Sequence, residues 1–242
     1  MLRTVFTEND RLSYNELGEV EATYSMVREH QEFDDFLVEF ASLAYEHGLT
    51  EKVGAFLLHR HFMAEPEKVL VEVPQQVEGG RIALVTSPRA VVSSDDYTSF
   101  RWRLSSGSEF TPLEFTADPA AARVLNKLAQ LPEFIDGYSE MLRKYGLEDL
   151  LGLCITDKES LKPTRNEWLV EYNRPDASVV IIERMDKDES QGLIPTVWVA
   201  SVREDARGYC RPAGICQGTC RIVGSGSHTY EHRRVNQGHD RS

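Results

Sequence analysis

Helix-spaced apolar residues and short β-branched stretches follow one another along the first half of the chain. A helix is predicted from about Ser13, which forms a capping box with Glu16. The next helix should begin near Phe33 and end before Gly48, a residue type that often terminates helices. Four strands should follow, because runs of β-branched and aromatic residues are separated by Pro, Gly, Ser and Asp. Their expected ranges are 53–62, 69–73, 81–86 and 100–104.

The second half of the chain repeats this order of elements. Asp118 stands as an N-cap in front of Pro119 and predicts a helix, and a further helix should run from Phe134 to Gly146. Strands are expected after it, because apolar and β-branched runs return. Their expected ranges are 151–155, 168–172, 178–183 and 196–202.

The two halves also align residue by residue. The segment GLTEKVGAFLL, which starts at Gly48, aligns with GLEDLLGLCIT, which starts at Gly146, at an offset of 98. Two further pairs continue the alignment at offsets of 99 and 96: Glu72 with Glu171, and Trp102 with Trp198. Matched helix ends, glycines, glutamates and tryptophans in one order indicate an internal duplication.

These patterns predict an α+β fold in which a unit of helices followed by antiparallel strands occurs twice. The two units would be related by an approximate two-fold axis, with two helical hairpins packed on antiparallel sheet. The expected divisions are 1–117 for the first repeat, 118–205 for the second, in one compact unit with the first, and 206–242 for a basic tail rich in Gly, Cys and His. A ligand would bind near the axis or between the halves.

Composition and charge narrow the class of protein. Of the 242 residues, 41% are hydrophobic, which is ordinary for a globular chain. The net charge is −12, and because residues 207–242 carry +4 the rest carries −16, which disfavours nucleic acid as a partner. No apolar run reaches the length of a membrane span, and the N-terminus becomes charged early, so a cytoplasmic or nuclear location is predicted. A small molecule is the expected partner, and a homo-oligomer is compatible with the sequence.

Two histidines at the end of the first predicted strand form a candidate metal site. His59 and His61 lie two residues apart, so strand alternation would place both imidazoles on one face. Two neutral nitrogens with one carboxylate leave coordination positions free for substrate or water, as zinc and iron sites require. The candidate carboxylates are Glu65, Glu72 and Glu171.

An explanation of the histidines without metal binding also stays open. Polar residues often end strands because strands end at water, and the pattern His-x-His occurs without metal. At the repeat offset of 98, the partners of His59 and His61 are Asp157 and Glu159, so both halves place possible ligands after the same strand. The spacing from Gly54 through His59 and His61 also resembles the first metal motif of cupins. The second cupin motif is absent, and the helix-rich halves argue against a cupin barrel.

The C-terminal tail holds a second candidate metal site. Cys216 and Cys220, and likewise His228 and His232, are four positions apart, which zinc sites allow. Two alternatives stay open: a flexible tail with incidental Cys and His, or a disulfide in an oxidising compartment. Tail histidines could also complete the site at His59.

Absent motifs disfavour the common nucleotide-binding and hydrolase classes. The chain has no phosphate-binding Gly-rich loop, no nucleophile elbow, no kinase signatures and no His-Glu-x-x-His helix. The function predicted is therefore a metal-binding α+β protein, with zinc or iron at the His-x-His site acting on a small molecule. The alternative is a non-enzymatic binding module with structural zinc in its tail, and the sequence does not decide whether the protein is an enzyme.

Three segments together resemble a family of filamentous-fungal proteins: GAFLLHRHF, TPLEF and the Cys/His tail. That family has a GLxLxHxH strand, a PxEF segment and a terminal Cys-x-x-x-Cys with histidines, and the resemblance covers most of the chain from about residue 35. Phe62 stands where the family pattern has cysteine. No activity is attached to the family, so the resemblance draws attention to His59 and His61 without implying a reaction.

Overall fold

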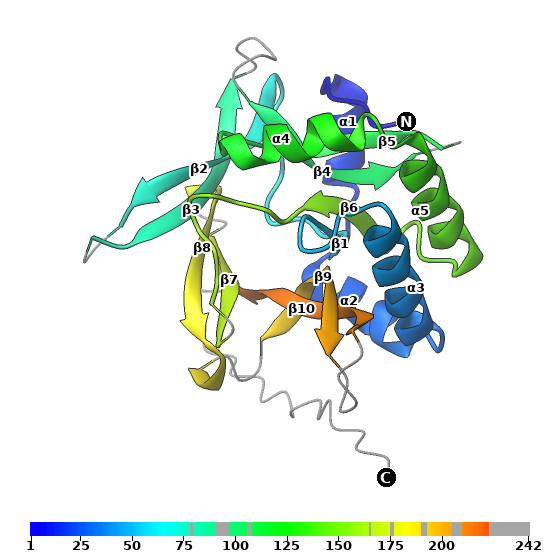
Figure 1. Cartoon of the computed structure of the whole chain (residues 1–242). Helices are drawn as coiled ribbons and strands as arrows, with labels where there is room; N and C mark the ends of the chain where they lie inside the picture. The colour runs from blue at the N-terminus through cyan, green and yellow to red at the C-terminus, as the bar shows by residue number, and fades with distance from the viewer. Residues whose placement is uncertain are drawn as a thin grey trace.

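The computed structural model describes residues 1–77, 80–90, 97–105, 108–164, 166–174, 177–189, 193–204 and 210–222. Within these ranges, residues 202–204 and 210–222 are described by their backbone. No helix in the described ranges is long and apolar enough to cross a bilayer. The chain is a mixed α+β protein, as the sequence predicts (Figure 1).

The described residues form five α-helices: α1 (Glu8–Asn15), α2 (Val20–Glu29), α3 (Phe33–Glu46), α4 (Pro119–Leu128) and α5 (Pro132–Lys144). The single helix predicted from Ser13 is wrong, because the chain forms α1 and α2 with a break between them. Ser13 lies inside α1, and the capping box is made by Thr7 and Asp10 instead. Asp118 caps α4 as predicted, since its side chain accepts a hydrogen bond from the Ala120 amide at 2.9 Å.

The strands form one curled sheet that closes on itself in the order β1-β6-β4-β5-β2-β3-β8-β7-β10-β9 (Figure 1). Their bounds are β1 (Val53–Leu57), β2 (Lys68–Gln76), β3 (Ile82–Ala90), β4 (Thr98–Leu104), β5 (Phe110–Thr116), β6 (Leu151–Ile155), β7 (Glu167–Arg174), β8 (Val179–Asp186), β9 (Ile194–Glu204) and β10 (Cys210–Ile222). The prediction of purely antiparallel sheet is wrong, because β2 pairs with β5 and β7 pairs with β10 in parallel. In each case the fifth strand of the half returns to lie beside the second. The first part of the predicted tail thus supplies a barrel strand.

The ring of strands maps onto itself when each strand of β1–β5 is exchanged with the strand five later. Gly48 and Gly146, after α3 and α5, both have positive φ, at 63° and 62°. At Gly152 a Cβ would lie 2.3 Å from the Trp102 carbonyl, and at Gly54 one would lie 3.0 Å from the Trp198 carbonyl. The close approach of strands therefore recurs at corresponding positions. The duplication itself stays a prediction, which this order of elements supports.

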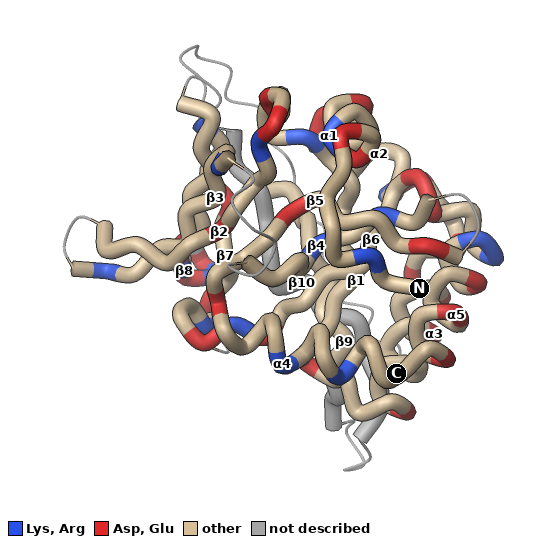
Figure 2. The backbone as a smooth tube through the Cα atoms, turned by 90° about the horizontal axis from the view of Figure 1, so that it is seen from above, with Lys and Arg blue, Asp and Glu red and all other residues tan. Residues whose placement is uncertain are grey.

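Two apolar clusters lie on opposite faces of the sheet. The outer cluster joins α3 and α5 to residues such as Ala55, Leu57 and Trp102, and these two helices, one from each half, pack on each other. Figure 2 shows acidic positions along α3 and α5, so negative charge is carried on this outer layer. The inner cluster includes Phe56 and Leu84 and fills much of the barrel. Buried charged residues interrupt this inner cluster, and they form the candidate site.

Candidate metal centre

The histidine segment follows β1 and is held in place by α1. β1 ends at Leu57, before the predicted boundary, so strand alternation does not extend to His59 and His61. The His61 amide donates to the Tyr14 hydroxyl at 3.3 Å, and the Ala64 amide donates to the Asn15 side chain at 2.7 Å. These contacts fix a non-strand segment beneath the first helix.

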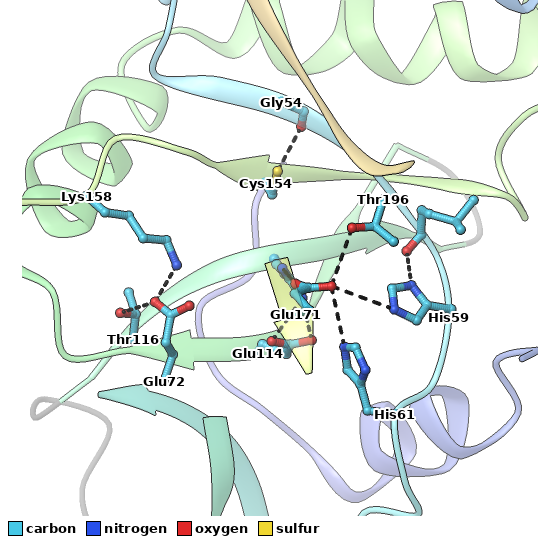
Figure 3. Close-up of polar contacts among 12 residues, drawn as sticks. Gly54, His59, His61, Glu72, Glu114, Thr116, Cys154, Lys158, Glu171 and Thr196 are labelled. Carbon is cyan, nitrogen blue, oxygen red and sulfur yellow. Dashed lines mark hydrogen bonds and ion pairs between the residues drawn. The ribbon is translucent and has the colours of Figure 1, made fainter. Parts of the chain in front are cut away.

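His59, His61 and Glu171 come together from distant parts of the chain. The Nε2 atom of each imidazole lies 4.0 Å from Oε2 of Glu171, which projects from β7 (Figure 3). The two rings are 4.5 Å apart between centroids and inclined by 75°. All three residues are buried, with exposed fractions of 5%, 7% and 3%. Strand alternation would have placed both imidazoles on the face of Ala55 and Leu57, whose side chains belong to the outer cluster, whereas the imidazoles lie at Glu171.

The backbone fixes which nitrogen of His59 carries hydrogen. Nδ1 lies 2.8 Å from the Leu57 carbonyl oxygen, which can only accept, so Nδ1 donates and neutral His59 keeps a lone pair on Nε2. Among the described residues Nε2 has no hydrogen-bond partner, and neither has Nδ1 of His61. The lone pair of Nε2 therefore lies 4.0 Å from a carboxylate oxygen, so two hydrogen-bond acceptors are opposed in a buried setting.

Glu171 is held in place by a buried arginine. Arg101, from β4, donates a hydrogen bond from one terminal nitrogen to Oε1 of Glu171. Its other terminal nitrogen donates to Oε1 of Glu114, on β5, at 3.1 Å. The Thr196 hydroxyl lies 3.4 Å from Oε2 of Glu171. Arg101 therefore orients Glu171 so that Oε2 faces the imidazoles.

Burial and neighbouring charges decide the protonation of the three groups. Burial lowers the pKa of His59 to about 4, helped by His61, and burial likewise lowers the pKa of His61 to about 4. Burial alone would raise the pKa of Glu171, but the Arg101 charge and the two imidazoles lower it to about 2. At neutral pH the centre thus holds two neutral imidazoles and one carboxylate, the protonation state in which each can bind a metal.

The spacing of the three groups is close to that of a coordination sphere. Their ligand atoms all lie within 4.8 Å of one another. In a tetrahedral zinc site with bonds near 2.0–2.1 Å, ligand atoms are separated by about 3.4 Å. Each imidazole nitrogen would need to approach the carboxylate oxygen by about 0.6 Å, and the widest separation in the group, up to 4.8 Å, would need to shorten by about 1.4 Å.

The other carboxylates named as candidates lie elsewhere. Glu72, which is fully buried on β2, binds Lys158 and accepts a hydrogen bond from Thr116 at 3.1 Å (Figure 3). Glu65 pairs with Lys68 on the surface at 2.6 Å. Glu171 is therefore the candidate carboxylate that the fold brings to the histidines.

The tail site cannot be placed in the same way. Cys216 and Cys220 lie in β10, whose backbone pairs with β7 and β9, and their side chains are outside the described set. His228 and His232 lie outside the described residues. Zinc binding by these four residues stays a prediction.

Sequence patterns missed the residues that orient Glu171. Glu114 is the one charged residue of β5, and Arg101 lies between Phe100 and Trp102 in β4, which also carries Arg103. A lone charge at a strand position expected to be buried was the available signal, because such a charge needs a buried partner. The pairing itself depends on which strands become neighbours in the closed sheet.

Comparison with known proteins gives no further guide to this arrangement, since no family model, curated protein or solved structure matches the chain. The resemblance to fungal proteins therefore stays a prediction. Function has to be argued from the geometry of the centre.

Proposed function

We propose that this protein binds a divalent metal, zinc or iron(II), through His59, His61 and Glu171, and acts through it on a small molecule. The observation that carries the proposal is the opposition of the His59 Nε2 lone pair and the Glu171 carboxylate in a buried setting. A cation between them removes this repulsion. A proton is a poor substitute at neutral pH, because the pKa of His59 is about 4.

The arrangement has features of known metal centres. A ligating histidine commonly donates its other ring nitrogen to a backbone carbonyl, as His59 does to Leu57. A ligating carboxylate is commonly oriented by a hydrogen-bond donor, as Glu171 is by Arg101. Two nitrogens and one oxygen leave at least one coordination position for water or substrate, which is typical of catalytic rather than structural sites. A bound metal would serve there as a Lewis acid or activate oxygen.

We also infer that the two halves of the barrel are a duplicated unit about an approximate two-fold axis. The exchange symmetry of the strand order and the corresponding glycine contacts support this inference. Under it, Glu171 and Glu72 are equivalent positions, which supplies a matched control for the metal centre.

Metal content of the full chain tests the proposal. Protein purified without chelator and dialysed against Zn²⁺, or against Fe²⁺ without oxygen, should bind one equivalent more than the Glu171→Gln and His59→Ala variants do. Glu72→Gln and His47→Ala should keep it, since Glu72 lies with Lys158 and His47 contacts Phe134.

A cobalt spectrum separates this centre from the tail. Co²⁺ bound at two imidazoles and a carboxylate shows no thiolate-to-metal charge transfer, whereas cysteine ligands would produce it. Equal metal content in wild type and Glu171→Gln would refute the proposal. So would a cobalt signal that disappears in Cys216→Ser/Cys220→Ser and persists in His59→Ala.

A further inference from the structure

A small cavity lies inside the barrel next to Glu171. It measures about 40 Å³, and residues from six strands or their ends line it. Its polar wall is formed by Arg101, Lys158 and Glu171, and Leu84, Ile182 and Val197 contribute to its apolar wall. Since Glu171 also faces the imidazoles, the carboxylate borders both the cavity and the proposed metal centre.

Two cationic side chains at this cavity have unused donors. The Lys158 ammonium has three hydrogens, and among the described residues Glu72 is its hydrogen-bond partner. Nε of Arg101 has no partner among the same residues. Both cations lie against the ring of Phe100, with Lys158 Nζ at 4.1 Å and Arg101 Cζ at 5.4 Å from its centroid. Phe100 also lines the cavity, so both charges are next to it.

The charge of this region is unbalanced until a metal enters. The linked buried groups that the structure describes here are three carboxylates, on Glu72, Glu114 and Glu171, and two cations, on Arg101 and Lys158. Their sum is −1, which opposes an anion. A divalent metal at the histidines would change the sum to +1, and one monoanion would then neutralise a region in which uncompensated charge is costly.

We propose that this cavity binds a small monocarboxylate, with its oxygens toward Lys158 and Arg101 and its carbon end against the apolar wall. This inference rests on the proposed metal, since the cavity attracts an anion after the metal binds. A water needs about 10–15 Å³ of such space, so the cavity has room for about three or four non-hydrogen atoms. Formate and acetate have this size, and both offer the two acceptor oxygens that the free donors need.

Binding of acetate to the full chain tests the inference, with metal occupancy measured separately by equilibrium dialysis. Calorimetry should detect acetate with zinc-loaded protein and not with metal-free protein. Acetamide has the same shape without charge and should bind at least about tenfold more weakly. The double variant Glu72→Leu/Lys158→Met keeps the net charge and removes one donor, so it should retain zinc and weaken acetate at least about tenfold.

The outcomes distinguish the two proposals. Zinc binding without acetate binding would overturn the monocarboxylate site and leave the metal centre standing. Acetate binding equal to that of acetamide, equal in metal-free protein, or unchanged in the double variant would overturn it as well. Failure to bind metal would remove both proposals at once, and dialysis would show this before any acetate is added.

Discussion

Glu72 and Glu171 occupy corresponding strands of the barrel, β2 and β7, yet they meet opposite kinds of partner (Figure 3). Glu72 forms an ion pair with the ammonium of Lys158, a residue that follows β6. Glu171 faces the imidazoles of His59 and His61, which follow β1. Each carboxylate thus meets residues that come after the first strand of the other half, β6 or β1.

The two carboxylates differ in whether the chain itself provides a positively charged partner of their own. At Glu72 the chain provides its own cation, so this carboxylate needs no cation from solution. At Glu171 the imidazoles are neutral, and Arg101 is shared with Glu114, so one carboxylate oxygen faces nitrogens that carry no charge. Two strands at matching places in the strand order thus hold one carboxylate that the chain neutralises and one that, under the proposed function, recruits a cation.

The largest expected effect comes from removing the cation that Glu114 and Glu171 share. Arg101→Met would leave Glu114 and Glu171 buried without their partner, and the free energy of unfolding should fall by about 5 kcal/mol, the upper end for a broken buried pair. Urea denaturation at pH 7 measures it. Arg103→Met is the control on the same strand, because Arg103 pairs with exposed Asp149 at 3.8 Å. The free energy of unfolding of this variant should fall by under about 1 kcal/mol. Similar losses in both variants would contradict the role given to Arg101.

A smaller effect on stability tests whether Lys158 is the charge partner that buried Glu72 requires. Lys158→Met alone leaves Glu72 as an unpaired buried carboxylate and should cost about 3 kcal/mol in the free energy of unfolding. Glu72→Leu/Lys158→Met removes both charges and should recover most of that loss, because apolar replacement of a buried pair is often neutral. Denaturation curves of the three proteins compare them directly. A double variant as unstable as the single one would mean that Lys158 stabilises the barrel through its packing on Phe100 rather than through Glu72.

Much of the local structure could be predicted from sequence, because it depends on neighbours in the chain. The ends of α3 and α5 at Gly48 and Gly146 follow from the positive φ that glycine permits. The limits of β6 follow from a five-residue apolar run that is buried throughout. His59 and His61 were identified as a pair, and Glu171 was one of three candidate carboxylates.

The remainder depends on contacts between distant strands. A bulge in β4 between Ser99 and Trp102 changes the alternation of side chains, so the direction of Arg101 could not be read from its position. Closure of the barrel required parallel pairing of β2 with β5 and of β7 with β10, for which no local pattern exists. Glu72 and Glu171 were equivalent candidates in sequence, and their partners separated them in the fold.

The smallest expected effect is the response of metal affinity to mild acid, and it measures how enclosed the Glu171 centre is. Protons compete with a metal for an imidazole when the pH is below the pKa of that imidazole. If both histidines had the ordinary pKa near 6.5, the affinity of the site for the metal would fall roughly several hundred-fold between pH 7 and pH 5.

Here the pKa of both imidazoles is about 4 and that of Glu171 about 2, so zinc affinity should change less than about twofold over that interval. The loss should begin as the pH falls through about 4. Competition with a chromophoric chelator, corrected for the protonation of the chelator, gives the affinity at each pH. A several-hundred-fold loss by pH 5 would show imidazoles that titrate as in water, and the buried opposition of nitrogen and carboxylate that distinguishes Glu171 from Glu72 would then be absent in solution.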